Sequence, residues 1–248
     1  MMDVQAPDGR PAASDRLIVA LDCDDHEALA LARSLEGTVR WLKVGMTLFY
    51  SAGPEIVLRM RDLGFDVFLD LKLHDIPHQV EGAAARVAGL GAGMLTVHAA
   101  GGRAMMEAAV RGVSAGATEA GVAPPAVLAV TVLTSMDDAG LAEIGVSRRA
   151  AEQVALLGTV ACEAGVNGLV CSPHEAASLS EIAGEGRLIV TPGVRPAWAA
   201  AGDQSRIATP AAAFGAGATH LVVGRPITGA AVPVDAARRI LEEMEESL

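Results

Sequence analysis

Three ionisable residues, Asp70, Lys72 and Asp75, lie within six positions of one another and directly follow an apolar segment. The segment 66–69, apolar after Asp66, is typical of a buried strand, and Pro77 limits its continuation. If the strand reaches residue 72, Asp70 and Lys72 point to the same side, because strand side chains alternate. Charges at the mouth of a buried strand are costly unless they pair with one another or with a ligand. The run is therefore a candidate active site, with a surface ion-pair network as the alternative.

The elements that must position this run are short apolar segments separated by Ala-rich amphipathic ones. We expect strands at 16–21, 41–45, 67–71, 94–98, 126–132, 168–171, 188–190 and 220–223, and helices at 26–35, 54–63, 80–90, 102–114, 148–163, 173–182 and 235–246. Strands alternating with helices indicate parallel βαβ units, and eight of them predict an α/β fold, a single-domain (β/α)8 TIM barrel. A doubly wound sheet is the alternative, but no Gly-x-Gly-x-x-Gly follows the first strand.

Polar residues stand at the ends of most predicted strands, where a barrel would gather them at one rim. They are Asp22, Lys43, Asp70 with Lys72, His98, Thr134, residues 191–193, and Gly224 with Arg225. Taken singly, Asp22 could cap a helix, Lys43 could be a solvated lysine and Thr134 an ordinary strand residue. His74 and His98 are expected to be structural.

Bulk composition excludes several classes of protein. With 248 residues, 51% of them hydrophobic, the chain can form one barrel domain at 15–248, preceded by a flexible extension at 1–14. A net charge of −11 argues against nucleic-acid binding, and no apolar run reaches membrane-spanning length. The three cysteines, Cys23, Cys162 and Cys171, lack metal-type spacing, which is typical of reduced thiols in a cytoplasmic protein.

The last strand leads into a possible phosphate site. Residues 221–223 run into Gly224, Arg225 and Pro226, which resembles a strand followed by a helix start. Backbone N–H groups there, together with the Arg225 guanidinium, suit a phosphate dianion, although an ordinary strand-to-helix turn remains the alternative. The long connection 191–206 is expected to form a lid.

Several motifs together resemble one family. They are Leu21-Asp22, Trp41-Leu42-Lys43-Val44-Gly45, the run from Asp70 to Pro77, and residues 97–102, 131–135, 191–196, 202–204 and 223–227. In this order they resemble the orotidine 5′-phosphate decarboxylase family from residue 16 to the C-terminus. The resemblance implies decarboxylation of orotidine 5′-monophosphate (OMP) to uridine 5′-monophosphate (UMP) and CO2, the last step of de novo UMP biosynthesis, with no cofactor and no metal.

The resemblance also implies roles for the charged residues. Without an electron sink, fixed charges must stabilise a carbanion at C6 of the pyrimidine. Asp70 would repel the departing carboxylate, Lys72 would protonate C6, and Asp75 would reach in from the partner subunit of a homodimer. Lys43 would hold Asp70 ionised and, like Asp22, contact the ribose.

The remaining implied contacts surround the nucleotide. Gly224, Arg225 and Arg195 would hold the phosphate, Gln204 would bridge phosphate and pyrimidine, and Thr134 would meet the pyrimidine edge. Ile76 and Gln79 would contact the substrate across the subunit boundary. The family usually has Asn-Thr where this chain has His78-Gln79, so a longer side chain replaces the threonine.

Two other functions stay open. Magnesium-dependent sugar-phosphate decarboxylases and aldolases share the barrel and the Asp-x-Lys-x-x-Asp core, but use a second-strand acid where this chain has Lys43. The second open function is that of a non-catalytic barrel that binds a nucleotide.

Overall fold

Eight parallel strands close into a barrel in the order of the sequence, which confirms the predicted (β/α)8 architecture. The computed structural model describes residues 12–196, 198 and 208–247. The strands are β1 (Leu17–Leu21), β2 (Trp41–Gly45), β3 (Asp66–Leu73), β4 (Met94–His98), β5 (Ala126–Val130), β6 (Gly168–Val170), β7 (Leu188–Pro192) and β8 (His220–Val223). β1 pairs with both β2 and β8, so the sheet has no free edge.

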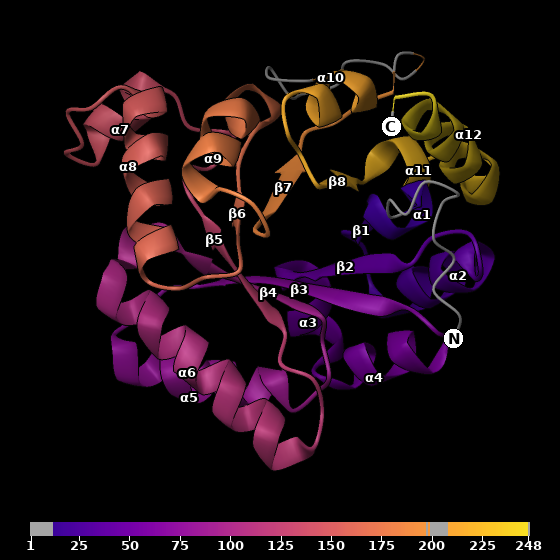
Figure 1. Ribbon diagram of the computed structural model, residues 1–248. Helices are drawn as coiled ribbons and strands as arrows, with labels where there is room; N and C mark the ends of the chain where they lie inside the picture. The colour runs from indigo at the N-terminus through magenta and orange to yellow at the C-terminus, as the bar shows by residue number, and fades with distance from the viewer. Residues whose placement is uncertain (1–11, 197, 199–207, 248) are drawn as a thin grey trace.

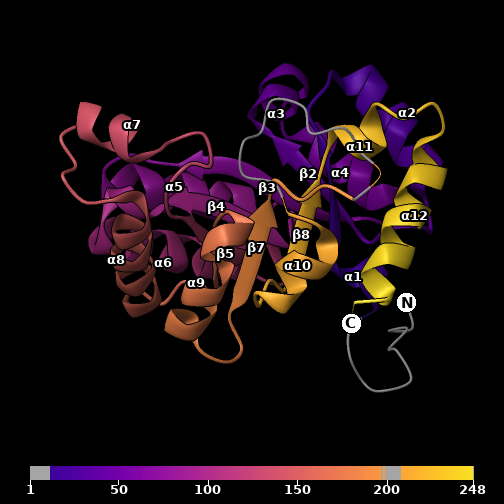
Figure 2. The ribbon, with the colours of Figure 1, turned by 90° about the horizontal axis from the view of Figure 1, so that it is seen from above.

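Helices surround the barrel (Figures 1 and 2). They are α1 (Ala13–Arg16), α2 (Asp25–Leu35), α3 (Met46–Ala52), α4 (Glu55–Asp62), α5 (Pro77–Ala88), α6 (Arg103–Ala120), α7 (Asp138–Glu143), α8 (Ala150–Glu163), α9 (Ala176–Ala183), α10 (Pro210–Gly215), α11 (Arg225–Thr228) and α12 (Pro233–Glu245), with 3-10 turns η1 (Ala99–Gly101) and η2 (Pro173–Glu175). In the described part of the chain, no helix has the length and apolar character that a membrane crossing requires.

The predicted strands agree with the observed ones to within about two residues, and the differences lie at the ends that matter for the site. β5 stops at Val130 rather than 132, so Thr134 lies in the following loop and not at the strand end. β3 and β7 each extend two residues further than expected, to Leu73 and Pro192. Helix α1 begins inside the stretch expected to be flexible, and Ala13 is buried in the core.

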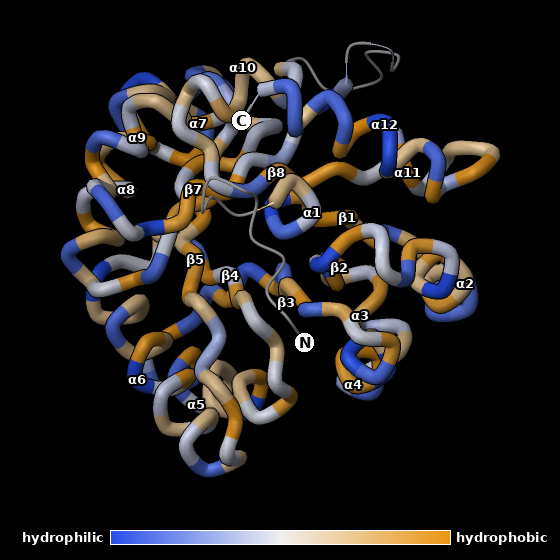
Figure 3. The backbone as a smooth tube through the Cα atoms, turned by 45° about the vertical axis from the view of Figure 1, so that its right-hand side comes forward, coloured by the Kyte–Doolittle hydropathy of each residue, from blue (hydrophilic) through white to orange (hydrophobic). Residues whose placement is uncertain are grey.

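Apolar side chains fill the molecule in two layers, as strand alternation requires. The interior of the barrel holds Ile18, Ala20, Phe68, Met94, Leu128, Val190 and Val222. The larger layer lies between the strands and the helices and takes the alternate strand residues, such as Val19 and Leu69. Figure 3 shows hydrophobic colours along β1 and β5, whereas the helices mix hydrophilic and hydrophobic positions. The packed interior leaves the C-terminal ends of the strands as the place for a cavity.

At the opposite end of the barrel, Trp41 and His220 close the interior. Their rings meet edge to face with centroids 6.2 Å apart, and the His220 ring lies 3.0 Å from the Thr219 hydroxyl. Burial, together with the nearby positive charges of Arg16 and Arg40, lowers the pKa of His220 to about 4. His220 is therefore neutral in the folded protein at neutral pH.

Candidate active site

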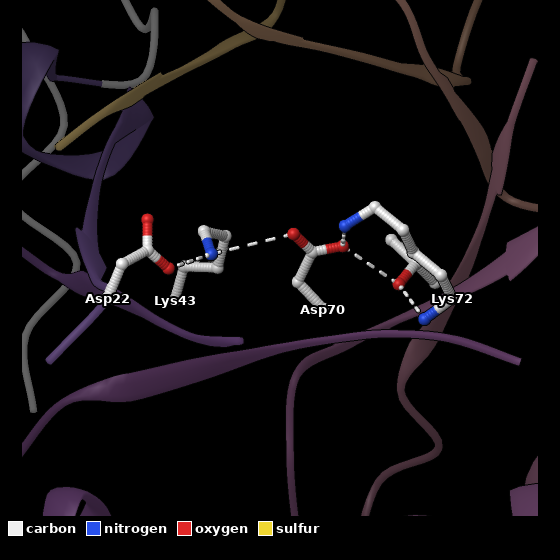
Figure 4. Close-up of polar contacts among 5 residues, drawn as sticks. Asp22, Lys43, Asp70 and Lys72 are labelled. Carbon is white, nitrogen blue, oxygen red and sulfur yellow. Dashed lines mark hydrogen bonds and ion pairs between the residues drawn. The ribbon is translucent and has the colours of Figure 1, made fainter. Parts of the chain in front are cut away.

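Four charged side chains, one directly after β1 and the others on β2 and β3, alternate in sign across the C-terminal mouth of the barrel (Figure 4). The Lys43 ammonium lies 3.0 Å from Asp22 Oδ1 and 3.5 Å from Asp70 Oδ2. The Lys72 ammonium lies 2.7 Å from Asp70 Oδ1. The side chains of Lys43 and Asp70 are 9% and 14% exposed, whereas that of Asp22 is 65% exposed. The structure brings together three members of the expected charge array, Lys43, Asp70 and Lys72, with Asp22 beside them, and the buried pair at the centre is no surface ion-pair network.

Lys43 can lie across the barrel mouth because Gly45 leaves room for it. Gly45 follows two residues later on β2 and pairs in register with Asp70. A Cβ atom at position 45 would lie 2.9 Å from the Lys43 Nζ and 3.1 Å from Asp22 Oδ1. The missing side chain therefore makes space for the Lys43–Asp22 pair.

Lys72 stands on an irregularity of β3. In the pairing with β4, Leu69 matches Leu95 but Leu73 matches Val97, so β3 has two more residues than β4 over this stretch. Lys72 has a φ of 51°, and it is the one non-glycine residue with positive φ in the described chain. Such a conformation costs on the order of 1–3 kcal/mol and is concentrated at functional sites. Asp70 and Lys72 meet as expected, but a bulge brings them together and not the regular strand pairing on which the prediction depended.

The surroundings of Asp70 keep it ionised. Burial raises the pKa of its carboxyl, but the positive charges of Lys43 and Lys72 and hydrogen bonds to the carboxylate outweigh that effect. The net pKa of Asp70 therefore lies below its ordinary value. One of those hydrogen bonds comes from the Thr96 hydroxyl, 3.0 Å from Asp70 Oδ1. Nothing in the pattern of the sequence singled out Thr96, except that it shares the inward face of β4 with Met94 and His98.

A cavity of about 400 Å³ opens over this array. Its lining includes the four charged residues, the apolar Phe68, Val130, Val170 and Val222, and the predicted contacts Thr134, Arg195, Gly224 and Arg225. Gly224 caps α11, where Arg225 and a proline open the first turn, as the sequence predicted. Arg195 follows β7, and its backbone N–H bonds the carbonyl of Ala208, 2.9 Å away, so the two ends of the long connection meet. The cavity thus carries alternating charges over β1–β3 and two guanidinium groups from the β7 and β8 ends.

Three predicted site residues are not brought to this cavity within the chain. Asp75, Ile76 and Gln79 lie at the start of α5, are exposed and are absent from the cavity lining. The Asp75 carboxylate accepts a hydrogen bond from the backbone N–H of Ile76, 2.6 Å away. Gln204 lies outside the described residues.

His74 and His98 face each other beside the array, with ring centroids 5.4 Å apart. Burial lowers the pKa of His98, and the nearby charges of His74 and Lys72 lower it further, against the opposing effect of Asp70. Neither ring lines the cavity. This agrees with the expected structural role of both.

The array does not have the donor set of a metal site. A divalent cation of the hard class needs several oxygen ligands around one point. Here the point between the carboxylates of Asp22 and Asp70 is taken by the ammonium of Lys43. Across the parts of the chain the structure describes, no three His, Cys, Asp or Glu side chains are grouped so that they could hold a metal ion.

Comparison with known proteins agrees with this geometry. The model of the orotidine 5′-phosphate decarboxylase / HUMPS family matches residues 15–240. An orotidine 5′-phosphate decarboxylase of Halorhodospira halophila is 53% identical over 230 residues, covering 92% of this chain and 95% of the relative. That of Heliobacterium modesticaldum is 49% identical over 238 residues, covering 95% and 98%.

Solved structures give the same result. The crystal structure of orotidine 5′-phosphate decarboxylase from Lactobacillus acidophilus superposes with a TM-score of 0.82 at 41% identity, covering 93% of this chain and 99% of that one. Sequence, fold and near-complete coverage agree, and the chain therefore belongs to the orotidine 5′-phosphate decarboxylase / HUMPS family.

Proposed function

We propose that this protein decarboxylates OMP to UMP and CO2 with the array Asp22–Lys43–Asp70–Lys72, completed by Asp75 of a second subunit. The reaction follows from the family and from relatives that align along nearly their whole length. The observation that carries the mechanism is the buried alternation of charges: one carboxylate, Asp70, held between two ammonium groups at 2.7 and 3.5 Å.

The difficult step is the loss of CO2 from C6 of the pyrimidine, because the bonding electrons stay on a ring carbon. A fixed ammonium near that carbon stabilises the growing negative charge, and Lys72 can then transfer a proton to it. Asp70 holds the Lys72 ammonium in place through their ion pair. It also repels the substrate carboxylate in the ground state by about 4 kcal/mol for charges about 4 Å apart at an effective dielectric of 20. Enzymes lower barriers by about 8–23 kcal/mol, so repulsion alone is insufficient and stabilisation by Lys72 must contribute.

The other groups of the cavity orient the nucleotide. Arg225 and Arg195 line the same cavity as Lys72 and offer charge-assisted hydrogen bonds to the 5′-phosphate, together with the backbone at Gly224. Thr134 lines the same cavity and can bond the pyrimidine edge. Gln204 is proposed to bridge phosphate and base. Binding energy at the phosphate then contributes to the transition state at C6.

A second copy of the chain is proposed to complete the site. Asp75 follows Lys72 by three residues but is exposed and turned to its own backbone. Apolar side chains around the mouth are also exposed: Ile76 by 62%, Met46 by 47% and Leu133 by 37%. A symmetric dimer would bury such a surface and deliver Asp75, Ile76 and Gln79 to the partner's nucleotide. The enzyme is also proposed to be cytoplasmic, because its three cysteines are free thiols, as is typical of a reducing compartment.

Mixing two inactive variants tests the shared site. Lys72→Ala removes the proton donor within the chain, and Asp75→Asn removes the residue proposed to cross over. Each alone should lose activity on OMP. After joint unfolding and refolding at equal concentrations, hybrid dimers should restore about one quarter of the wild-type activity, because half of the dimers carry one intact site. No recovery in the mixture would contradict the shared site.

The wild-type protein with OMP and a chelator tests the reaction itself, by the loss of pyrimidine absorbance. Turnover is expected under these conditions. No turnover would overturn the assignment, and metal-dependent activity on a sugar phosphate would favour the sugar-phosphate class instead.

A further inference from the structure

Thr96 occupies the gap that the β3 bulge opens toward β4. Its side chain is completely buried, and its single hydroxyl makes two hydrogen bonds to the array. The oxygen accepts a bond from the backbone N–H of Lys72 at 2.8 Å, and the O–H donates to Asp70 Oδ1 at 3.0 Å. The same carboxylate oxygen receives the Lys72 ammonium at 2.7 Å. Thr96 thus contacts the backbone of one charged residue and the side chain of the other.

The geometry of β3 explains why such a group is needed. Residues 70–72 have no register partner on β4, so the strand pairing does not fix the backbone at Lys72. Its left-handed conformation is unfavourable for a side chain with a Cβ and persists only where the surroundings hold it. The Thr96 hydroxyl satisfies the N–H at that position, in a buried setting where an unsatisfied donor is costly.

We propose that Thr96 is a positioning residue for the decarboxylation: its hydroxyl fixes the left-handed turn at Lys72 and orients the Asp70 carboxylate, and so sets where the Lys72 ammonium stands. Thr96 is absent from the cavity lining, so it acts through these two residues and not on the substrate. The inference rests on the proposed function only in needing Lys72 to act at the reacting carbon.

This role predicts a particular kinetic effect. Loss of the hydroxyl shifts the ammonium at the reacting end but leaves Arg225 and the rest of the nucleotide site intact. The turnover number should therefore fall while KM stays nearly constant. A misplacement of about 1 Å can cost on the order of a hundredfold in rate.

The second predicted effect concerns pH. The charged or titratable groups that face Asp70 are Lys43 from β2, Lys72 from β3 and His98 from β4. A variant without the Thr96 donor loses one hydrogen bond to the ionised carboxylate, so the pKa of Asp70 rises. The acid limb of the kcat profile should then move to higher pH, and a merely structural role would not move it.

The test compares Thr96→Val, which has nearly the same shape but no hydroxyl, with Thr96→Ser, which keeps the hydroxyl. Thr219→Val is the matched control: the Thr219 hydroxyl also accepts a hydrogen bond from a backbone N–H, that of Ile189 at 2.9 Å, but it lies beside His220 at the opposite end of the barrel and does not line the cavity. For each protein, kcat and KM on OMP are measured across pH, together with the melting temperature.

Thr96→Val should lower kcat by about 10- to 100-fold with KM within about twofold, and should shift the acid limb upward. Thr96→Ser should stay within about threefold of wild type, and Thr219→Val should keep kcat while losing a similar amount of melting temperature. Unchanged kcat in Thr96→Val, or an equal loss in Thr96→Ser, overturns the inference.

If Thr96→Val does not fold, Thr96→Cys replaces it, because a thiol is a weak donor of similar size. Equal kcat for the Cys and Ser variants then overturns the inference, and a lower kcat for Cys supports it. A wild-type protein without turnover on OMP would instead overturn the proposed function, so the two failures are distinguishable.

Discussion

Replacing Asp70 by asparagine tests whether the array repels the substrate carboxylate. The change keeps the shape of the side chain and removes one negative charge. It is made in a Lys72→Ala background, because that protein cannot protonate C6 and leaves OMP intact during a binding measurement. Lys43, 3.5 Å from Asp70 Oδ2, remains in both proteins.

The size of the effect follows from Coulomb's law. At an effective dielectric of 20, the attraction between Lys43 and Asp70 at this distance is about 5 kcal/mol, and it favours the ionised form of Asp70 when Lys72 is removed. A substrate carboxylate about 4 Å from Asp70 is repelled by about 4 kcal/mol, equivalent to roughly a thousandfold in affinity. Because the cavity is open to water, screening reduces this repulsion. We therefore expect Asp70→Asn to raise the affinity for OMP at least tenfold.

Titration calorimetry measures this change in affinity, with OMP and UMP as ligands of the Lys72→Ala variant and of the double variant that also carries Asp70→Asn. UMP lacks the carboxylate, so its affinity should change by less than about threefold and report any general damage to the site. The ratio of OMP to UMP affinity should rise at least tenfold when Asp70→Asn is added. A ratio that stays within about twofold would refute ground-state repulsion by Asp70 and assign the catalytic effect to Lys72 and the partner's charge.

Three further predictions concern other parts of the molecule. Arg225→Ala should reduce kcat/KM far more on OMP than on the phosphate-free nucleoside orotidine, since the guanidinium is proposed to hold the phosphate; equal losses in steady-state assays would contradict this. Gly45→Ala should lower kcat/KM by about tenfold or more, because the new Cβ would meet the Lys43–Asp22 pair; a fully active variant would show that the pair is dispensable. His220 has its pKa lowered to about 4, so the unfolded chain binds its proton first and stability should fall as pH decreases from about 6.5 to about 4. His220→Gln should flatten that dependence in urea unfolding, and an unchanged slope would assign it to other groups.

The barrel could be predicted from the sequence because each strand is a short apolar run and each long helix is amphipathic. The rim followed from the same pattern, since Asp22, Lys43 and Asp70 stand where strands end. The meeting of Lys43, Asp70 and Lys72 was predictable for that reason, and the structure brings these three together with Asp22. Pairing across subunits depends on a second chain, and no pattern of alternation within one chain determines it.

What the sequence did not predict depends on local backbone geometry. The helix α3 follows β2 directly, and its Thr47, Phe49 and Tyr50 have strand-like propensities that tertiary packing overrides. No glycine in the sequence indicates the bulge at Lys72, because the chain adopts positive φ at a lysine. Thr96 gains its contacts only through that bulge, so its importance depends on a register shift that propensities do not encode.

The two surplus residues of β3 set a condition for protein engineering. An Asp-x-Lys pair grafted onto a regular strand of another barrel would keep the spacing in sequence but would present its lysine from a different point of the rim. Deleting one residue between Leu69 and Leu73 would turn the following side chains to the opposite face. A designed decarboxylase on a new scaffold therefore needs a third strand with more residues than the fourth. It also needs a buried hydroxyl on the fourth strand to hold the backbone of the extra residues.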